Sequence, residues 1–242
     1  MGNTANYNGW EGINLEYSDN NTISGNTANY NNYEGINLEN SNNNTISGNN
    51  ANGNYQSGIF LEDSHNTTIS GNTANYNYWV GIYVAHSDYN TISGNSANNN
   101  LGETGIHLLQ SDHNTISGNT ANNNYWAGIC LTQSDYNTIS GNTANENMYG
   151  IELWYNSDNN TVTGNTLHYN VLRCIHESSD CIGNVFANND CIDEDESDGG
   201  KDEEVNQALI SIIMLTIIGG IIALGVAGVV ILLKKRKMRK PK

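Results

Sequence analysis

The sequence has almost no proline and, over most of its length, almost no basic residues. Its one proline among 242 residues is Pro241, so other residues must make the turns. All 25 carboxylates lie before residue 205, where Arg173 and Lys201 are the only basic side chains, which gives this part a formal charge of −23 (two basic against 25 acidic). Such a domain repels anionic polymers, so neither nucleic acid nor an acidic polysaccharide is an expected partner.

Apolar residues at helical spacing are also lacking before residue 205, which argues against an α-helical domain. A repeat is present instead. The motif Asn-Thr-Ile-Ser-Gly-Asn returns about every 23 residues, and a second motif, Gly-Ile-x-Leu, keeps the same interval. Self-similarity at a fixed interval of this length is typical of solenoids, in which each repeat is one coil that buries its apolar side against its neighbours.

Within a repeat, Ile36 and Leu38 alternate with polar neighbours, which predicts a short strand with one buried face. Asn, Gly and Ser fill the joints, and these residues accept tight turns and positive φ. Parallel coils stack roughly 4.8 Å apart, so equivalent residues form columns. One column is entirely Asn, and we expect its amides to hydrogen-bond from rung to rung. Its members are Asn26, Asn49, Asn72, Asn95, Asn119, Asn142 and Asn165.

Together these motifs resemble the parallel β-helix repeats of the NosD-type family over residues 1–192. The resemblance implies an all-β, right-handed, pectin-lyase-like solenoid of about eight 23-residue rungs. The family is often labelled as periplasmic copper-binding, or as carbohydrate-binding and sugar-hydrolysing. The fold alone does not decide a reaction, because the same solenoid carries lyases, hydrolases, epimerases and inert spacers. The six histidines form no His-x-His unit and fall in different columns, which does not favour copper.

The chain changes character after the repeats. Residues 193–207 are acidic without apolar periodicity, and we expect a solvated stalk there. Residues 208–233 contain no charge; as a helix they would span about 39 Å, enough to cross a hydrocarbon layer of about 30 Å. The basic segment 234–242 predicts a cytoplasmic tail. The sequence therefore predicts a single-pass protein of the cell membrane whose repeat domain is extracellular.

The repeats begin directly after Met1, without the basic and apolar stretch of an export signal. We therefore expect a further N-terminal segment that supplies a signal and a cap for the solenoid. The alternative is a tail anchor that leaves the repeats in the cytoplasm. That arrangement would send the basic tail across the membrane, against the usual charge rule.

A first candidate site is a column that follows the serine of each repeat. Four of its carboxylates would lie on consecutive rungs and repel one another unless they share protons or recruit cations. Ca²⁺ takes oxygen ligands in loose geometry and is the cation expected here. The alternative is that these side chains only close Asx-turns onto nearby backbone N–H groups. The column contains Asp19, Asn42, His65, Asp88, Asp112, Asp135, Asp158 and Asp180, of which Asp88, Asp112, Asp135 and Asp158 are the candidate ligands.

A second candidate site is a column of aromatic residues that precedes the Gly-Ile motif. Its rings would line one face of the solenoid, where they could stack against sugars. The alternative is that they pack across the turns and shield the rung edges. The column contains Trp10, Tyr33, Trp79, Trp126 and the neighbouring Tyr149, and Gln56 and Glu103 interrupt it.

Three of the four cysteines lie in the last, degenerate repeats. Cys174 and Cys191 are each followed by Ile, in place of the Gly-Ile motif, so they would stack one rung apart. That spacing suits a disulfide, and an exported domain favours one. Cys181 is the competing partner.

These patterns predict a surface-displayed, non-catalytic adhesion or binding module, whose partner is neutral carbohydrate or a cation-bridged surface polymer. The first alternative is an enzyme of the glycoside hydrolase type, because adjacent rungs can hold carboxylate pairs about 5–10 Å apart. The second alternative is a structural rod. No residue is singled out as catalytic.

Overall fold

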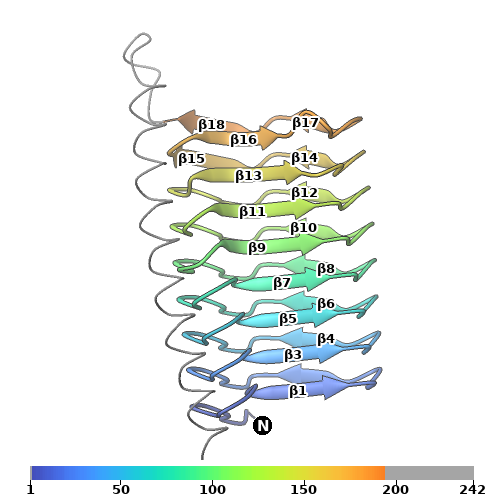
Figure 1. Cartoon of the computed structure of the whole chain (residues 1–242), viewed down its shortest axis with the longest axis vertical. Helices are drawn as coiled ribbons and strands as arrows, with labels where there is room; N and C mark the ends of the chain where they lie inside the picture. Colours follow the sequence, from blue (N-terminus) through green and yellow to red (C-terminus); the bar gives the residue numbers. More distant parts are fainter. Residues whose placement is uncertain (1, 194–242) are drawn as a thin grey trace, which may run out of the picture. The chain divides into compact units, whose positions relative to one another are not determined.

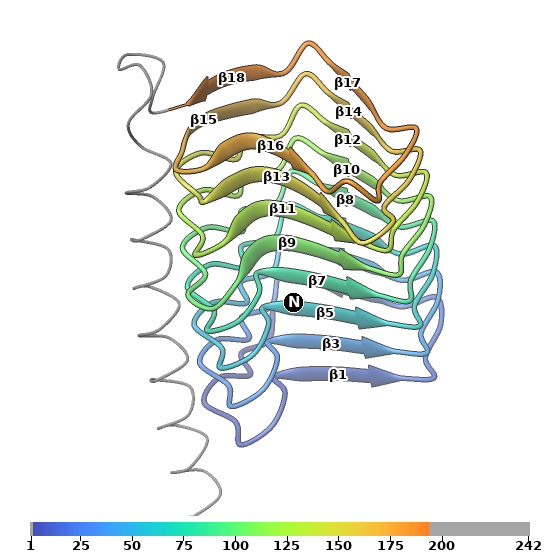
Figure 2. The same cartoon turned by 45° about the horizontal axis from the view of Figure 1, so that its top comes forward.

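The structure is a computed structural model that describes residues 2–193. Over these residues the chain forms a right-handed parallel β-solenoid of about eight turns with no helix, which confirms the predicted fold (Figure 1). Turning the molecule shows the coils stacked with their strands parallel (Figure 2). Within residues 2–193, no helix is long and apolar enough to cross a membrane. The predicted transmembrane helix and basic tail, and the predicted stalk beyond Asp193, lie outside the described residues.

Two eight-stranded parallel sheets form two walls of the solenoid. Sheet 1 contains β1 (Ile13–Glu16), β3 (Ile36–Glu39), β5 (Ile59–Glu62), β7 (Ile82–Ala85), β9 (Thr104–Leu109), β11 (Ala127–Thr132), β13 (Tyr149–Trp154) and β16 (Arg173–Glu177). Sheet 2 contains β2 (Thr22–Ser24), β4 (Thr45–Ser47), β6 (Thr68–Ser70), β8 (Thr91–Ser93), β10 (Thr115–Ser117), β12 (Thr138–Ser140), β14 (Thr161–Thr163) and β17 (Val185–Ala187). A third wall consists of isolated parallel bridges and ends in the pair β15 (Thr166–Asn170) and β18 (Asp190–Asp193).

The core is filled by the same four positions of each repeat. In one coil these are Ile46 from sheet 2, Ala51 after the bridge, and Ile59 and Leu61 from sheet 1, and none of them is exposed. Burying an Ile or Leu side chain stabilises a fold by roughly 1.5–3 kcal/mol. A single coil cannot cover these side chains by itself, so the stacking of coils provides the stability.

The two motifs require their glycines for different physical reasons. Gly48 has a φ of +61°, and nothing lies within 4 Å of the position a Cβ would take. Glycine is needed there for its backbone conformation. At Gly105 a Cβ would lie 2.7 Å from the carbonyl oxygens of Ala97 and Gly128. Glycine is needed there because neighbouring rungs approach too closely for any side chain.

The predicted Asn column forms a continuous ladder of side-chain hydrogen bonds. In the middle of it, Asn72 is 2% exposed. Its Oδ1 accepts the backbone and side-chain N–H groups of Asn49, both at 2.9 Å. Its Nδ2 donates to the carbonyl oxygen of Ile46 at 2.9 Å and to Oδ1 of Asn95 at 3.0 Å. All four hydrogen-bonding positions of this buried amide are therefore satisfied, which confirms the structural role assigned to the Asn column.

Candidate functional site

On the outer face of sheet 1, the row of side chains that begins at Glu16 varies along the solenoid, and so does a second row that begins at Asn14. The residues of the second row occupy the variable position of Gly-Ile-x-Leu, and strand pairing aligns them on successive rungs. We call them the outer row. It contains, from β1 to β16, Asn14, Asn37, Phe60, Tyr83, His107, Cys130, Glu152 and His176. Sequence reasoning missed this row, although its signal was a motif position that changes while its Ile and Leu neighbours persist.

In the last rungs, the side chains of the outer row and its neighbours gather around the carboxylate of Glu152. The residue is only 1% exposed, although it lies on the outer face of the sheet. Trp126 Nε1 donates to Glu152 Oε2 at 2.6 Å, and His176 Nδ1 lies 3.0 Å from Oε1. The His176 ring stacks on Tyr149, with ring centroids 4.9 Å apart. The carboxylate is thus held in one position by groups from the repeats on either side of its own.

Two rungs earlier, a second carboxylate faces a second imidazole. Glu103 Oε2 lies 3.7 Å from His107 Nδ1. The other ring nitrogen, Nε2, lies 3.1 Å from the Thr132 hydroxyl. The His107 ring contacts Tyr83, with centroids 5.2 Å apart. Burial raises the pKa of Tyr83 to about 12, with a further contribution from the charge of Glu103, so this phenol stays protonated at neutral pH.

Cys130 lies between these two pairs and is buried. Its Sγ is 3.7 Å from Glu152 Oε2. Burial, reinforced by the nearby Glu152 charge, raises the pKa of the Cys130 thiol well above its usual range. A thiol in such surroundings remains protonated and is a poor nucleophile. Cys130 therefore acts here as a packing residue.

The predicted aromatic column is continuous along the backbone, but its rings do not form one flat face. Successive N–H to C=O bonds join its positions from Tyr33 to Tyr149, with Gln56 and Glu103 in between. Trp10 stacks on Tyr33 with centroids 5.0 Å apart, whereas Trp79 meets Tyr83 edge-on at 5.2 Å. Trp126 meets Tyr149 edge-on at 5.3 Å. The later rings therefore join the outer row and line the same part of sheet 1.

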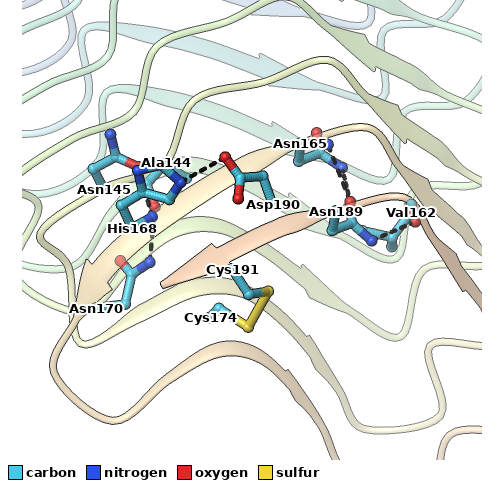
Figure 3. Close-up of a disulfide and its surroundings, with 10 residues drawn as sticks. All are labelled: Ala144, Asn145, Val162, Asn165, His168, Asn170, Cys174, Asn189, Asp190 and Cys191. Atoms are coloured by element: carbon cyan, nitrogen blue, oxygen red, sulfur yellow. Dashed lines mark hydrogen bonds and ion pairs between the residues drawn. A yellow bond between two sulfur atoms is a disulfide. The ribbon is translucent and has the colours of Figure 1, made fainter. Parts of the chain in front are cut away.

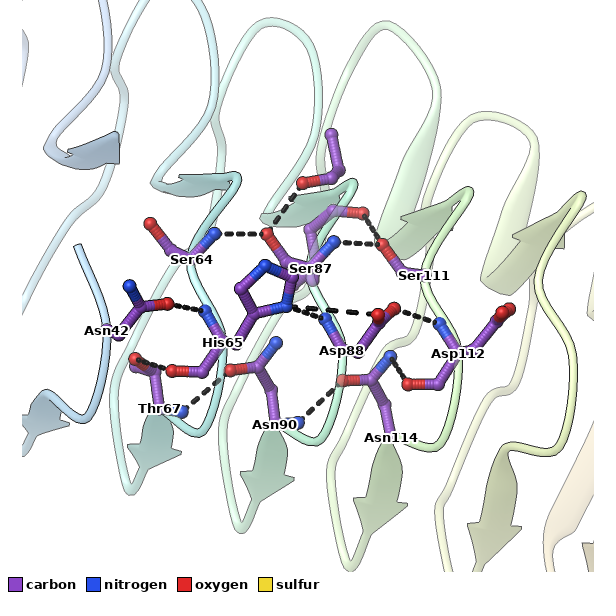
Figure 4. Close-up of polar contacts among 12 residues, drawn as sticks. Asn42, Ser64, His65, Thr67, Ser87, Asp88, Asn90, Ser111, Asp112 and Asn114 are labelled. Carbon is purple, nitrogen blue, oxygen red and sulfur yellow. Dashed lines mark hydrogen bonds and ion pairs between the residues drawn. The ribbon is translucent and has the colours of Figure 1, made fainter. Parts of the chain in front are cut away.

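The predicted Asp column forms a ladder along the turns between sheet 1 and sheet 2 (Figure 4). Oδ1 of Asp88, Asp112 and Asp135 accepts the backbone N–H of the next member at 2.7, 2.7 and 2.8 Å. These bonds reach the next rung, so they are not the Asx-turns weighed as the alternative. Each of these carboxylates keeps one oxygen outside the ladder. Burial and the charges of its two Asp neighbours raise the pKa of Asp135.

The column ends differently from the prediction. Asp158 Oδ1 accepts the N–H of Ile182 at 2.7 Å, so Ile182 occupies the position assigned to Asp180. The Ser-Asp pair at residues 179–180 suggested the wrong alignment. The strand register of the last rung, which pairs Thr161 with Val185, requires a step of 24 residues.

A family model described as periplasmic copper-binding protein (NosD) matches residues 1–124 and 80–208. The chain belongs to the NosD family. No curated protein matches the chain significantly.

Solved structures share the fold of this NosD-family chain. The A-module of the mannuronan C-5 epimerase AlgE4 from Azotobacter vinelandii has 19% identity and a TM-score of 0.63, over 76% of this chain and 61% of that one. The periplasmic alginate epimerase AlgG has 17% identity and a TM-score of 0.60, over 76% of this chain and 61% of that one. The chain thus spans less than two thirds of either structure. At these identities the similarity establishes the fold.

The outer row does not fit the copper site that the NosD description suggests. His176 Nδ1 and Cys130 Sγ both face Glu152, whose two oxygens already bind His176 and Trp126. Within residues 2–193 there is no group of three or more His, Cys, Asp or Glu side chains placed to hold a metal ion. Copper needs several ligands that converge on one point. No chemistry is therefore assigned to copper in this part of the chain.

Cys174 and Cys191, the pair favoured by the sequence, form a disulfide with their Cα atoms 5.7 Å apart (Figure 3). The reasoning that pointed to them was wrong, because the two do not stack one rung apart. They are 17 residues apart, less than one coil. Cys191 pairs with Leu167 in the third wall, whereas Cys174 belongs to sheet 1. The bond therefore joins two walls of the last coil, and Cys181 stays free.

Proposed function

We propose that this chain is a polysaccharide-binding solenoid and that the outer face of sheet 1, from β7 to β16, holds the sugar chain. The outer row carries the proposal. The first two rungs fold with Asn14 and Asn37 at this position, so the solenoid does not require anything else there. From β5 onward the position changes to aromatic, imidazole and carboxylate groups while the buried residues continue to repeat. Packing explains part of this change, because Phe60 and Tyr83 join a small apolar cluster with Val80, Ala85 and Leu109. A ligand on this face accounts for the imidazole, carboxylate and aromatic groups of the later rungs.

The chemistry of the face suits a sugar. Tyr149 and Trp126 supply apolar ring surface with polar edges, which suits the C–H faces of a pyranose. His176 and Trp126 supply polar groups at the edges of their rings for hydroxyl groups, and the buried Glu152 carboxylate holds both rings in place before any ligand arrives. The names of the two structural relatives refer to mannuronan and alginate, which supports a polysaccharide as the ligand class. The negative charge of this domain, with Arg173 as its one basic side chain before residue 201, favours a neutral polymer over an anionic one.

The test is affinity electrophoresis of the full chain in gels that contain neutral polysaccharides or alginate. We expect retardation by at least one neutral polymer. Glu152→Gln keeps the size of the residue but removes its charge, and Trp126→Phe keeps an aromatic ring but removes the donated N–H; both should weaken retardation. Glu16→Gln is the matched control, because it removes an exposed carboxylate of β1 that has no such partners. Equal retardation of all four proteins would refute a role for this face.

Catalysis is a second candidate, and the two carboxylate–imidazole pairs favour it. Glycoside hydrolysis uses one carboxyl group to protonate the leaving oxygen and a second to activate water. Glu103 and Glu152 lie two rungs apart, a rise along the solenoid axis of roughly 10 Å at about 4.8 Å per rung. An enzyme would release new reducing ends from the polymer that it binds, and Glu152→Gln would stop the release even at polymer concentrations that restore binding. Retention without new ends would leave the binding function alone.

The proposal includes a place on the cell surface, as the sequence predicts. It is supported by the uncharged segment 208–233 and the basic residues after it. Membrane fractionation of the source cells, followed by protease treatment of intact cells, tests it. Digestion of the repeats in intact cells would support surface display, and protection would refute it.

An EDTA arm in the electrophoresis separates Ca²⁺-dependent binding through the Asp column from binding through the outer row. A folded protein that retains no glycan would favour the structural rod.

A further inference from the structure

The turns that precede sheet 1 form a shallow hollow in the first rungs, apart from the outer row. It has a volume of about 290 Å³. The column formed by Tyr30, Gly53 and Tyr76 lies on one side, and the column with Tyr55, Tyr78 and Leu101 lies on the other. The rings of Tyr55 and Tyr78 are stacked with centroids 4.9 Å apart and planes 4° apart. All of these tyrosines are exposed, with Tyr76 at 61% and Tyr78 at 42%.

A second buried Asn ladder, which contains Asn31, Asn54 and Asn77, lies between the two columns and forms a fixed floor. Asn54 is not exposed, and its Oδ1 accepts both the backbone and the side-chain N–H groups of Asn31, at 2.9 and 3.0 Å. Since the floor amides are held by neighbouring rungs, the tyrosine rings stand on a base that does not have to rearrange. A rigid aromatic surface loses little conformational entropy when it binds.

Gly53 is the residue that opens the hollow. Its column carries tyrosine at Tyr7, Tyr30 and Tyr76, with φ values of 56°, 56° and 57°. Gly53 has nearly the same φ, 65°, so the backbone there does not require glycine. A Cβ at Gly53 would instead lie 2.5 Å from Cε1 of Tyr30. The missing side chain therefore lets the Tyr30 ring lie over Gly53 and leaves a gap in a row of rings.

We infer that this hollow is a binding site for a neutral sugar unit of a polysaccharide, separate from the proposed face of sheet 1. No charged residue lines the hollow, although carboxylates occur throughout the solenoid. A neutral ligand with one apolar face and polar edges matches tyrosine rings that carry hydroxyl groups at their tips. The volume is at the low end for ligand sites, which fits one or two sugar rings. The two columns run along the solenoid axis, so a polymer can continue beyond the hollow.

The test is affinity electrophoresis of the full chain in a β-glucan, a galactomannan and a xylan, with alginate as the anionic control. Gly53→Tyr restores the repeat residue and fills the gap, and Tyr78→Ala removes one wall. Each should weaken retention by a neutral polymer by about tenfold, because the sugar loses stacking contact with about one tyrosine ring. Tyr136→Ala is the matched control, because it removes an exposed ring stacked on His113, 5.2 Å away in a different column, and should change nothing.

Gly53→Tyr should fold, because Tyr7 already stacks on Tyr30 at 5.2 Å in the same column. Tyr78→Ala tests the hollow independently, whether or not Gly53→Tyr folds. Unchanged retention in both variants would overturn the inference, as would a parent protein that retains no neutral polymer. Self-association that Gly53→Tyr abolishes, without any sugar retention, would assign the hollow to a second copy instead. Glu152→Gln reports on sheet 1 alone, so failure of the proposed function and failure of this site are distinguishable.

Discussion

Replacement of Asn72 by alanine is the most direct test of how this solenoid is held together. The change removes four hydrogen bonds in the interior of the ladder. The backbone N–H of Asn49 then loses the acceptor that the side chain supplied. Leaving a buried polar group unsatisfied costs roughly 1–3 kcal/mol, and each further lost bond costs roughly 0.5–1.5 kcal/mol. We therefore expect Asn72→Ala to lower the free energy of unfolding by about 2.5–7.5 kcal/mol.

The sequence itself contains a milder version of this change. In a parallel ladder, Thr67 stands where other rungs have Asn, and its hydroxyl accepts the Asn44 N–H at 3.3 Å. Asn72→Thr keeps an acceptor and should cost clearly less than Asn72→Ala. Asn32→Ala is the control, because Asn32 is exposed, and its change should stay within about 0.5 kcal/mol.

The assay must allow for local opening, because each coil of a solenoid contacts only its neighbours. Denaturant unfolding of the full chain gives the total change, and hydrogen exchange followed by mass spectrometry gives its location. Exchange should accelerate in β4, β6 and β8 before it does so in distant rungs. If Asn72→Ala and Asn32→Ala had the same effect, the ladder would not stabilise the fold and this reasoning would be refuted.

Four further changes test other parts of the structure. Gly105→Ala should destabilise by about 3 kcal/mol through overpacking, whereas Gly48→Ala should cost only about 1–2 kcal/mol of backbone strain; thermal unfolding that ranked them in the opposite order would contradict these roles. The raised pKa of Asp135 means that its contribution to stability is present at low pH and is lost as the pH rises through that pKa. Asp135→Asn should therefore stabilise by up to about 1 kcal/mol at neutral pH but not below about pH 3, and equal unfolding profiles would argue against repulsion in the column. Cys174→Ser should speed hydrogen exchange in β16 and β18 only, because a disulfide across a short loop stabilises by roughly 3 kcal/mol. Unchanged exchange in these two strands would show that the disulfide does not stabilise the last coil.

Much of the architecture follows from the repeat because the interactions that build it recur at one interval. Ile59 and Leu61 alternate with polar residues, which indicates a strand with one buried face, and the repeat places the same pair on every rung. The Asn ladder could be predicted for the same reason, since identical amides at a fixed spacing must meet. The Asp column was placed correctly where the interval held and incorrectly at Asp180, where the last rung departs from it.

The candidate site could not be predicted in this way. Glu152, Trp126 and His176 belong to three different repeats, and their side chains meet only because the register aligns β11, β13 and β16. The variable position of the motif marked the row, but the contacts depend on which way each ring turns. Trp10 lies flat on Tyr33, whereas Trp79 turns edge-on to Tyr83, although both occupy the same column.

The sequence by itself determined the coil, its buried residues, its ladders and the acidic character of residues 1–205, because these depend on spacing and composition. The tertiary structure alone decided which outward side chains come together, and which two walls the disulfide joins. The physical reason is that a solenoid core is specified by a pattern repeated on every rung. Its surface chemistry is specified by single residues, whose neighbours are set by strand register and side-chain packing.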